Sequence, residues 1–213
     1  MNVNVVTFDL DGTLVNTLPA ISNAFNHILK KYGYITFPTN RYVDFIGNGF
    51  PVVFDRINDI IKIKEKKEDF LTEVREFYNK NFLDGIYLYD GVAQLLDYLV
   101  KEGKILAIIT NKDSKATSEH VKTILSKWKF KYVFGNPEDK SYPAKPNPYA
   151  IEKIIEDGYK RSEIVHIGDM IVDINMAKNA NIKEIHCKYG YGKDILNEIS
   201  VDNARDIIGI IKW

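Results

Sequence analysis

The feature that most constrains the fold of this chain is a short apolar run that ends in two aspartates. Residues 5–14 read VVTFDLDGTL, and the mostly β-branched and aromatic run begins at residue 3. Such a run is typical of a strand that is covered on both faces of a parallel sheet. Asp9 and Asp11 follow it, before a glycine and a threonine. We therefore expect a central strand that delivers two carboxylates to a turn at its carboxyl end.

Four further apolar runs in the rest of the chain have the same character and are separated by helical patterns. The runs cover residues 104–110, 131–134, 163–167 and 182–187. Apolar residues at spacings of three and four predict helices over residues 92–103, 114–127, 148–157 and 171–179. Five short strands that alternate with helices predict an α/β fold with a doubly wound, Rossmann-like parallel sheet.

The block between the first two predicted strands is helical and contains no convincing strand. Helical spacing begins at residue 18, and the predicted helices cover residues 18–32, 42–46, 52–61 and 70–78. Because this block interrupts the alternation of strands and helices, we expect it to be an insertion. The predicted organisation is a core domain of residues 1–15 and 84–213 and a helical cap domain of residues 16–83.

The charge balance and the single cysteine restrict the partners and the compartment. Lysine plus arginine equals aspartate plus glutamate, at 29 each, so no overall field favours nucleic acid or an anionic membrane. Cys187 has no second cysteine with which to form an internal disulfide, which fits a reducing compartment. No run approaches the roughly 20 apolar residues of a membrane-spanning helix. We expect a cytoplasmic protein, either a monomer or a homodimer, that binds neither nucleic acid nor membranes.

Polar side chains follow several predicted strands at the edge where the strands end. In open α/β sheets, ligands bind outside the carboxyl ends of the strands. Residues from four separate segments are therefore expected to meet at one edge. They are Asp9, Asp11, Thr110, Asn111, Lys145, Asp169 and Asp173.

Four aspartates at one edge of a sheet require a cation. Carboxylates held close together repel, and some of them protonate unless a cation neutralises them. Oxygen ligands without histidine or cysteine favour Mg²⁺ over Zn²⁺. The four histidines lie within predicted helices and strands and are expected to be structural. Lys145, the Thr110 hydroxyl and nearby backbone N–H groups offer donors to phosphate oxygens, so the set points to phosphoryl transfer.

The motifs and their order resemble those of the haloacid dehalogenase superfamily. The matching residues are FDLDGTL at 8–14, Thr110 with Asn111, Lys145 with Pro146, and Gly168 with Asp169 followed by Asp173. The helical insert after the first motif is similar to the cap of the phosphoglycolate phosphatase branch. Three shorter stretches indicate the same branch: IGNG at 46–49, TNK at 110–112 and YGYG at 189–192.

The resemblance implies a role for each matching residue. Asp9 would be the nucleophile that forms an aspartyl-phosphate, and it would also bind Mg²⁺. Asp11 would serve as acid and then as base, while its backbone carbonyl binds the metal. The remaining roles are phosphoryl-oxygen binding by Thr110 and Asn111, charge neutralisation by Lys145, Mg²⁺ binding by Asp169 and support of the metal or its waters by Asp173.

The cap is expected to select the substrate. Glycines in the loop of residues 46–49 would let the backbone approach a ligand, although they also suit a simple helix-breaking turn. In the branch that the chain resembles, this loop faces the active site, which makes Asn48 and Gly49 specificity candidates. In the same branch a nearby arginine also faces the active site, so the resemblance makes Arg56 a candidate for binding a second anionic group such as a carboxylate. These features make 2-phosphoglycolate the leading substrate.

Other functions use part of the same machinery. Pyrophosphate, a nucleoside monophosphate or a sugar phosphate would need the same catalytic residues and different cap contacts. A phosphomutase is disfavoured because Gly12, Thr13 and Leu14 follow Asp11. A non-catalytic phosphoacceptor module, in which phosphorylated Asp9 is hydrolysed slowly, would have no need of Asp11.

Overall fold

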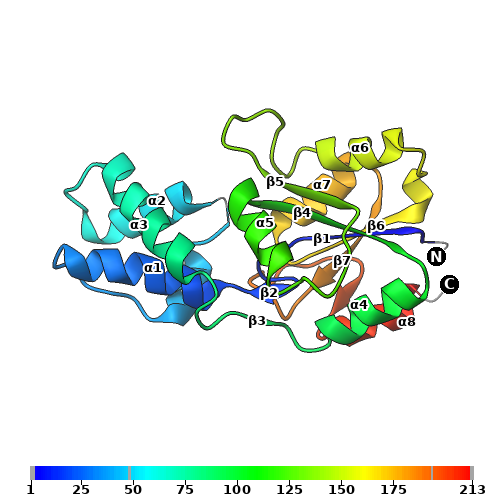
Figure 1. Cartoon of the computed structure of the whole chain (residues 1–213), viewed down its shortest axis with the longest axis horizontal. Coiled ribbons are helices and arrows are strands. Elements are labelled where there is room, and N and C mark those ends of the chain that lie inside the picture. Colours follow the sequence, from blue (N-terminus) through cyan, green and yellow to red (C-terminus); the bar gives the residue numbers. More distant parts are fainter. Residues whose placement is uncertain (1–2, 48, 193, 212–213) are drawn as a thin grey trace. The chain divides into compact units, whose positions relative to one another are not determined.

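The computed structural model describes residues 3–47, 49–192 and 194–211 (Figure 1). The chain folds into two units. Met1–Val15 and Leu88–Trp213 form the first, and Asn16–Tyr87 form the second. Within the described residues, none of the helices combines the length and the apolar character that a membrane span needs.

The first unit is built on a six-stranded parallel sheet with the strand order β5-β4-β1-β6-β7-β8. Strand β1 lies between β4 and β6, and Phe8 is opposite Ile108 on one side and Ile167 on the other. All four residues of β1 are buried. The strands are β1 (Val5–Phe8), β4 (Ile105–Asp113), β5 (Tyr132–Asn136), β6 (Ile164–Gly168), β7 (Lys183–Cys187) and β8 (Ser200–Val201). The predicted doubly wound parallel sheet with β1 in its interior is confirmed.

Helices alternate with these strands along the chain. Their bounds are α4 (Val92–Lys101), α5 (Ser114–Lys122), α6 (Tyr149–Glu156), α7 (Ile171–Asn179) and α8 (Ile207–Ile211). Helix α5 contacts β4 and β5, and α7 contacts β6 and β7. The apolar spacing of α4 explains its burial, since Leu95, Leu96 and Leu99 are all buried.

The second unit is the predicted helical insert between β1 and β4. It consists of α1 (Leu18–Lys31), a 3₁₀ helix (Thr39–Asp44), α2 (Phe50–Ile61) and α3 (Lys67–Asn81). Aromatic residues form its core: Phe25 contacts Phe50 edge-on at 5.4 Å between ring centroids. The short strands β2 (Val15–Asn16) and β3 (Tyr87–Leu88) pair with each other where the chain leaves and re-enters the first unit.

The structure differs from the prediction in several elements. Strands β2, β3 and β8 were not predicted, because two residues are too short to show a period. Helix α8 was not predicted either, and the helix predicted over residues 114–127 ends at Lys122. The helix predicted over residues 42–46 is a 3₁₀ helix that begins and ends earlier. Strand β4 continues past residue 110 to Asp113, with an irregular register opposite β5. Thr110 and Asn111 are therefore strand residues, whereas the sequence placed them at the strand's end.

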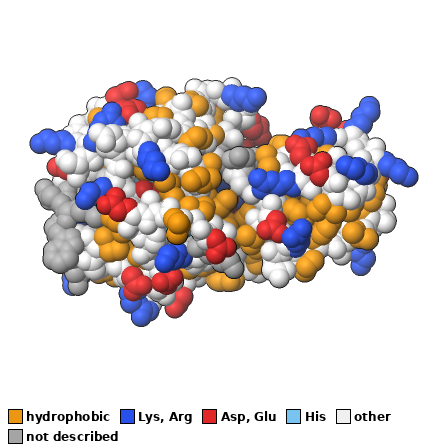
Figure 2. Space-filling view, turned by 180° about the vertical axis from the view of Figure 1, so that it is seen from behind, with side chains coloured by type: hydrophobic (Ala, Val, Ile, Leu, Met, Phe, Trp, Pro, Cys, Tyr) orange, Lys and Arg blue, Asp and Glu red, His pale blue; other side chains and the backbone are white. Residues whose placement is uncertain are grey.

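The surface carries charges of both signs. On the face drawn in Figure 2, lysine and arginine side chains are interspersed with aspartate and glutamate side chains. This agrees with the equal numbers of acidic and basic residues. The face in view therefore presents no broad basic field of the kind that nucleic-acid binding requires.

Candidate active site

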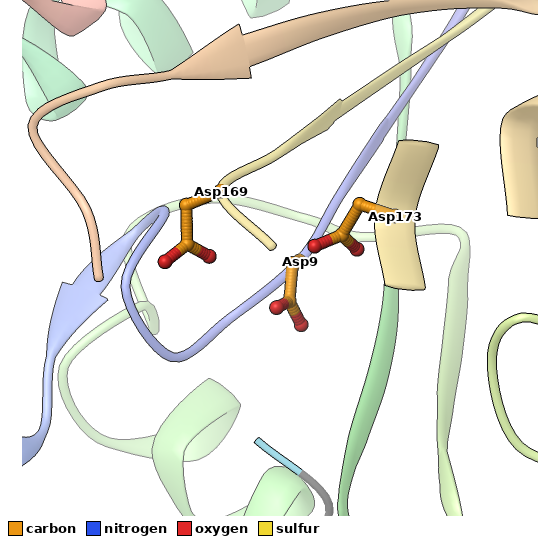
Figure 3. A group of neighbouring side chains, drawn as sticks. All are labelled: Asp9, Asp169 and Asp173. Atoms are coloured by element: carbon orange, nitrogen blue, oxygen red, sulfur yellow. The ribbon is translucent and has the colours of Figure 1, made fainter. Parts of the chain in front are cut away.

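Three buried aspartates meet at the carboxyl edge of the sheet (Figure 3). Asp9 directly follows β1, Asp169 directly follows β6, and Asp173 lies in the first turn of α7. One carboxylate oxygen of each lies within 4.8 Å of the others. Asp9 is 7% exposed, and the other two are fully buried. Because β1 and β6 are adjacent parallel strands, the residues that follow them are close together, as expected from the sequence.

The turn after β1 is shaped by Gly12 and anchored to β6. The N–H of Asp9 donates to Ile167 O at 2.9 Å, which continues the pairing of the two strands. Gly12 has φ +88°, a conformation that favours glycine. A Cβ atom at this position would also overlap the carboxylate of Asp169. Gly12 thus lets the turn after β1 approach the carboxylate of Asp169 closely.

Lys145 lies between two of the three carboxylates. Its Nζ is 2.9 Å from Oδ1 of Asp9 and 2.6 Å from Oδ1 of Asp173. The Asn111 side chain holds the Lys145 backbone from both sides, accepting from its N–H at 2.8 Å and donating to its carbonyl at 3.0 Å. Asn111 was predicted to hold phosphoryl oxygens; in the structure its side chain fixes the loop that carries the lysine.

The ionisation of this cluster follows from burial and from the neighbouring charges. Burial raises the pKa of Asp9 to about 6, although the Lys145 ammonium lowers it. Burial and the carboxylates of Asp9 and Asp173 raise the pKa of Asp169 well above its ordinary value. Burial also opposes ionisation of Asp173, but Lys145 and His166 outweigh it and hold the pKa of Asp173 below its ordinary value. Three ionised carboxylates would therefore carry more negative charge than Lys145 alone neutralises.

Asp169 is the carboxylate that shows this imbalance most clearly. Among the described residues its hydrogen-bond donors are neutral: the Thr13 hydroxyl at 3.1 Å and the N–H of Tyr191 at 2.7 Å. A buried carboxylate beside two others is costly unless a cation is bound. Because the group offers only carboxylate oxygens, its chemistry fits a hard divalent cation such as Mg²⁺.

The fourth predicted aspartate, Asp11, has a different partner. The Nζ of Lys112 lies 3.1 Å and 3.2 Å from its two carboxylate oxygens. The Lys112 side chain is only 7% exposed. Lys112, the last residue of TNK at 110–112, had no predicted role. Its place near the site could have been predicted, because residues two apart on an extended strand share a face, which puts Lys112 on the same face as Thr110.

The YGYG loop at residues 189–192 closes around Asp169. The Tyr191 N–H donates to its carboxylate, and the Tyr189 hydroxyl donates to Thr13 O at 3.0 Å. A Cβ atom at Gly190 or at Gly192 would overlap atoms of Asp169. These glycines are therefore required for close approach of the loop to a site carboxylate, a role that the motif alone did not reveal.

The predicted specificity residues of the cap lie in the second unit. Asn48 lies outside the described residues. Gly49 has φ +80° and directly precedes α2, so the turn before this helix requires its conformational freedom. Nη1 of Arg56 donates to Ile46 O at 2.6 Å and to Asp44 O at 3.1 Å, and the residue is exposed. Arg56 thus braces the segment that leads into the predicted specificity loop.

Comparison with known proteins agrees with this geometry. A family model described as haloacid dehalogenase-like hydrolase matches residues 6–187. A phosphoglycolate phosphatase of Haemophilus influenzae is 30% identical over 201 residues, which cover 90% of this chain and 88% of the relative. A phosphoglycolate phosphatase of Vibrio cholerae is 30% identical over 220 residues, which cover 99% of this chain and 96% of the relative.

A solved structure is similar over the same extent. The crystal structure of a predicted phosphoglycolate phosphatase from Haemophilus somnus matches with a TM-score of 0.85 at 28% sequence identity. The match covers 99% of this chain and 98% of that chain. Both the family model and the relatives span most of the chain, and the matched region contains Asp9, Lys145 and Asp169. The chain therefore belongs to the haloacid dehalogenase-like hydrolase family, as an enzyme of the phosphoglycolate phosphatase-like kind.

Proposed function

We propose that this protein hydrolyses a small phosphomonoester with the help of Mg²⁺, through an aspartyl-phosphate formed on Asp9. The observation that carries the proposal is the position of Asp9 at the end of β1, in contact with Lys145 and within 4.8 Å of the buried Asp169 carboxylate. A carboxylate nucleophile must be ionised to attack. With its pKa raised to about 6, Asp9 is mostly ionised at neutral pH, and a bound divalent cation would favour that form further.

The two half-reactions use Asp9 and Asp11 in turn. In the first, a carboxylate oxygen of Asp9 attacks phosphorus while the bond from phosphorus to the ester oxygen breaks. Asp11 gives its proton to that oxygen, so the product leaves as an alcohol. In the second, the Asp11 carboxylate takes a proton from the water that attacks phosphorus, and inorganic phosphate departs from Asp9. The Asp11 carboxylate that exchanges this proton lies 3.1 Å from Nζ of Lys112.

The other residues would neutralise the charge of the phosphoryl group and position it. Asp9, Asp169 and the backbone carbonyl of Asp11 would hold Mg²⁺, which when bound neutralises phosphoryl charge. Lys145 supplies the second positive charge, and the Thr110 hydroxyl donates to a phosphoryl oxygen. The side chain of Asp173 is engaged by Lys145 at 2.6 Å and by the Met170 N–H at 3.0 Å. We therefore assign Asp173 to holding Lys145, with any effect on the metal passing through that lysine or through water.

Removal of divalent metal is expected to stop catalysis. Hydrolysis of p-nitrophenyl phosphate should fall by about 10²-fold or more in chelator, because Mg²⁺ neutralises charge that Lys145 alone does not. Steady-state rates after chelation, followed by titration with MgCl₂, measure this. Asp169→Asn should raise the Mg²⁺ concentration needed for half-maximal rate, whereas Asp202→Asn, a change at an exposed residue, should not. Undiminished turnover in chelator would contradict the metal assignment.

Among small substrates we propose 2-phosphoglycolate. The support is that the similar proteins of Haemophilus influenzae and Vibrio cholerae are phosphoglycolate phosphatases by name, together with Arg56, an exposed cation in the cap. Pyrophosphate, nucleoside monophosphates and sugar phosphates are the alternatives, and a panel of these phosphates at equal concentration separates them. The proposal expects the highest kcat/KM for 2-phosphoglycolate.

Arg56→Ala tests the second anionic group. We expect the variant to raise KM for 2-phosphoglycolate about 10-fold or more, while KM for ethyl phosphate, which lacks the carboxylate, changes little. Steady-state kinetics with both substrates measure the difference. Arg75→Ala is the matched control, because Arg75 is another exposed arginine of the cap. Equal effects of Arg56→Ala on the two substrates would remove this role of the arginine.

A further inference from the structure

A buried chain of hydrogen bonds and ion pairs leads from the interior of the sheet to the nucleophile. Thr7 Oγ1 lies 2.8 Å from Nδ1 of His166, and Nε2 of His166 lies 3.0 Å from Oδ1 of Asp173. From there Lys145 Nζ lies 2.6 Å from the same Asp173 oxygen and 2.9 Å from Oδ1 of Asp9. Thr7, His166 and Asp173 are fully buried. Three of these five residues are the candidate machinery; Thr7 and His166 are additional.

The register of the sheet brings the residues of this hydrogen-bonded series together. Thr7 and His166 are direct partners across the β1–β6 ladder, so their side chains lie on the same face of the sheet. Thr7 precedes Asp9 by two residues. His166 lies on β6, the strand that leads into Asp169. Two polar side chains inside buried strands are costly unless they are hydrogen-bonded, and here they are bonded to each other and to Asp173.

The partners of His166 fix where its ring carries hydrogen. If the Thr7 hydroxyl donates to Nδ1, then Nε2 carries the hydrogen of the neutral ring. If the ring is doubly protonated, Nδ1 donates to Thr7, whose hydroxyl has Val165 O at 3.3 Å as an acceptor, and Nε2 again carries hydrogen. The remaining tautomer would set a lone pair of Nε2 against the Asp173 carboxylate. In both satisfied arrangements, Nε2–H donates to Asp173.

We infer that His166 and Thr7 are positioning residues that hold Asp173 in the orientation in which it keeps Lys145 against Asp9. The inference rests on the proposed function for its effect on rate. Asp173 Oδ1 accepts from His166 and Lys145, and Oδ2 accepts from the Met170 N–H at 3.0 Å. Three donors from three segments fix the carboxylate plane. Without the histidine, the carboxylate can rotate and draw the Lys145 ammonium away from Asp9.

Matched substitutions separate hydrogen bonding from packing. His166→Leu keeps an apolar group of similar size and removes the donor, whereas His166→Gln offers an amide N–H toward Asp173. Thr7→Val removes the hydroxyl at constant shape, and Thr7→Ser keeps it. We expect His166→Leu to lower kcat by about 10- to 100-fold, the size of effect seen for groups that orient a catalytic ligand, with KM nearly unchanged. His166→Gln and Thr7→Ser should recover most of the rate, and Thr7→Val should lose less than His166→Leu.

A double-mutant cycle tests whether His166 acts through Lys145. If it does, the double variant Lys145→Met, His166→Leu should be no slower than Lys145→Met alone. The shift of the urea midpoint in the double variant should also be smaller than the sum of the shifts in the two single variants. A rate for His166→Leu equal to wild type, a failure of His166→Gln to recover rate, or additive effects in the cycle would overturn the inference. If wild type hydrolysed no phosphomonoester, the proposed function would fail. Non-additive urea midpoints would still support the coupling, and additive midpoints would overturn it.

Discussion

Asp9→Asn is expected to abolish turnover of every phosphomonoester that the wild-type protein hydrolyses, with a loss on the order of 10³-fold or more. The amide has nearly the same size as the carboxylate, but its oxygen carries no charge and is a poor nucleophile. Asp9 is 7% exposed and lies 2.9 Å from Lys145, so the substitution places the amide at the same point of the site. Steady-state kinetics over a range of substrate concentrations measure the loss.

The same variant should fold at least as well as wild type in the absence of metal. Burial raises the pKa of Asp9 to about 6, so ionised Asp9 costs stability above that pH, and the neutral amide removes this cost. Urea unfolding at pH 7.5 in chelator compares the two proteins. Asp202→Asn, at an exposed position of the same unit, is the control for charge removal alone. An Asp9→Asn protein that is folded and still turns over substrate would exclude Asp9 as the nucleophile.

Lys145→Met is expected to lower both the rate and the stability. The lysine side chain is 2% exposed and pairs with Asp9 and Asp173, so its loss leaves two buried carboxylates without their cation. Removing one partner of a buried ion pair costs about 3–5 kcal/mol. The rate should fall by about 10²-fold or more, because the positive charge that faces the phosphoryl group is lost. Urea unfolding and steady-state kinetics measure the two effects.

The loss of stability in Lys145→Met should depend on pH with a definite sign. The pKa of Asp173 is held below its ordinary value in the wild-type protein, so Asp173 contributes stability above its unfolded pKa, and this contribution is lost on acidification. The difference between wild type and Lys145→Met should therefore be largest at neutral pH and shrink as the carboxylates protonate. Adding Asp173→Asn to Lys145→Met should restore part of the stability and little of the rate. A Lys145→Met protein as stable as wild type at pH 7 would contradict this account.

The sheet could be predicted from the sequence because buried strands appear as short apolar runs. The cluster of polar residues could be predicted because parallel strands end at the same edge of a sheet. Buried runs identified five of the six strands, and the rule that parallel strands end at one edge brought Asp9, Asp169 and Asp173 together. Lys145 could be placed because prolines delimit its loop and its order along the chain is that of a known family. These predictions require only where a strand or helix ends and which of its faces is apolar, and the pattern of a single sequence indicates both.

The partners of individual side chains could not be predicted in this way. The Lys112–Asp11 pair and the Thr7–His166–Asp173 chain depend on the register between strands that are far apart in sequence. The periodicity of a strand predicts the face on which a residue lies. The hydrogen-bond partner of that residue depends instead on which residue of the neighbouring strand lies opposite. For the same reason His166 was expected to be structural, although its ring contacts a site carboxylate.

Transfer of phosphate to the carboxylate of Asp9 can be detected by reductive trapping of the acyl phosphate. Borohydride reduces an aspartyl-phosphate to homoserine and leaves a free aspartate unchanged. Wild-type protein is mixed with 2-phosphoglycolate and Mg²⁺, quenched with borohydride within one turnover, digested and analysed by mass spectrometry. We expect homoserine at position 9 when substrate and Mg²⁺ are both present, and none in chelator or in Asp9→Asn. Rapid hydrolysis with no reduced residue, or with the reduced residue at another aspartate, would exclude Asp9 as the phosphate acceptor.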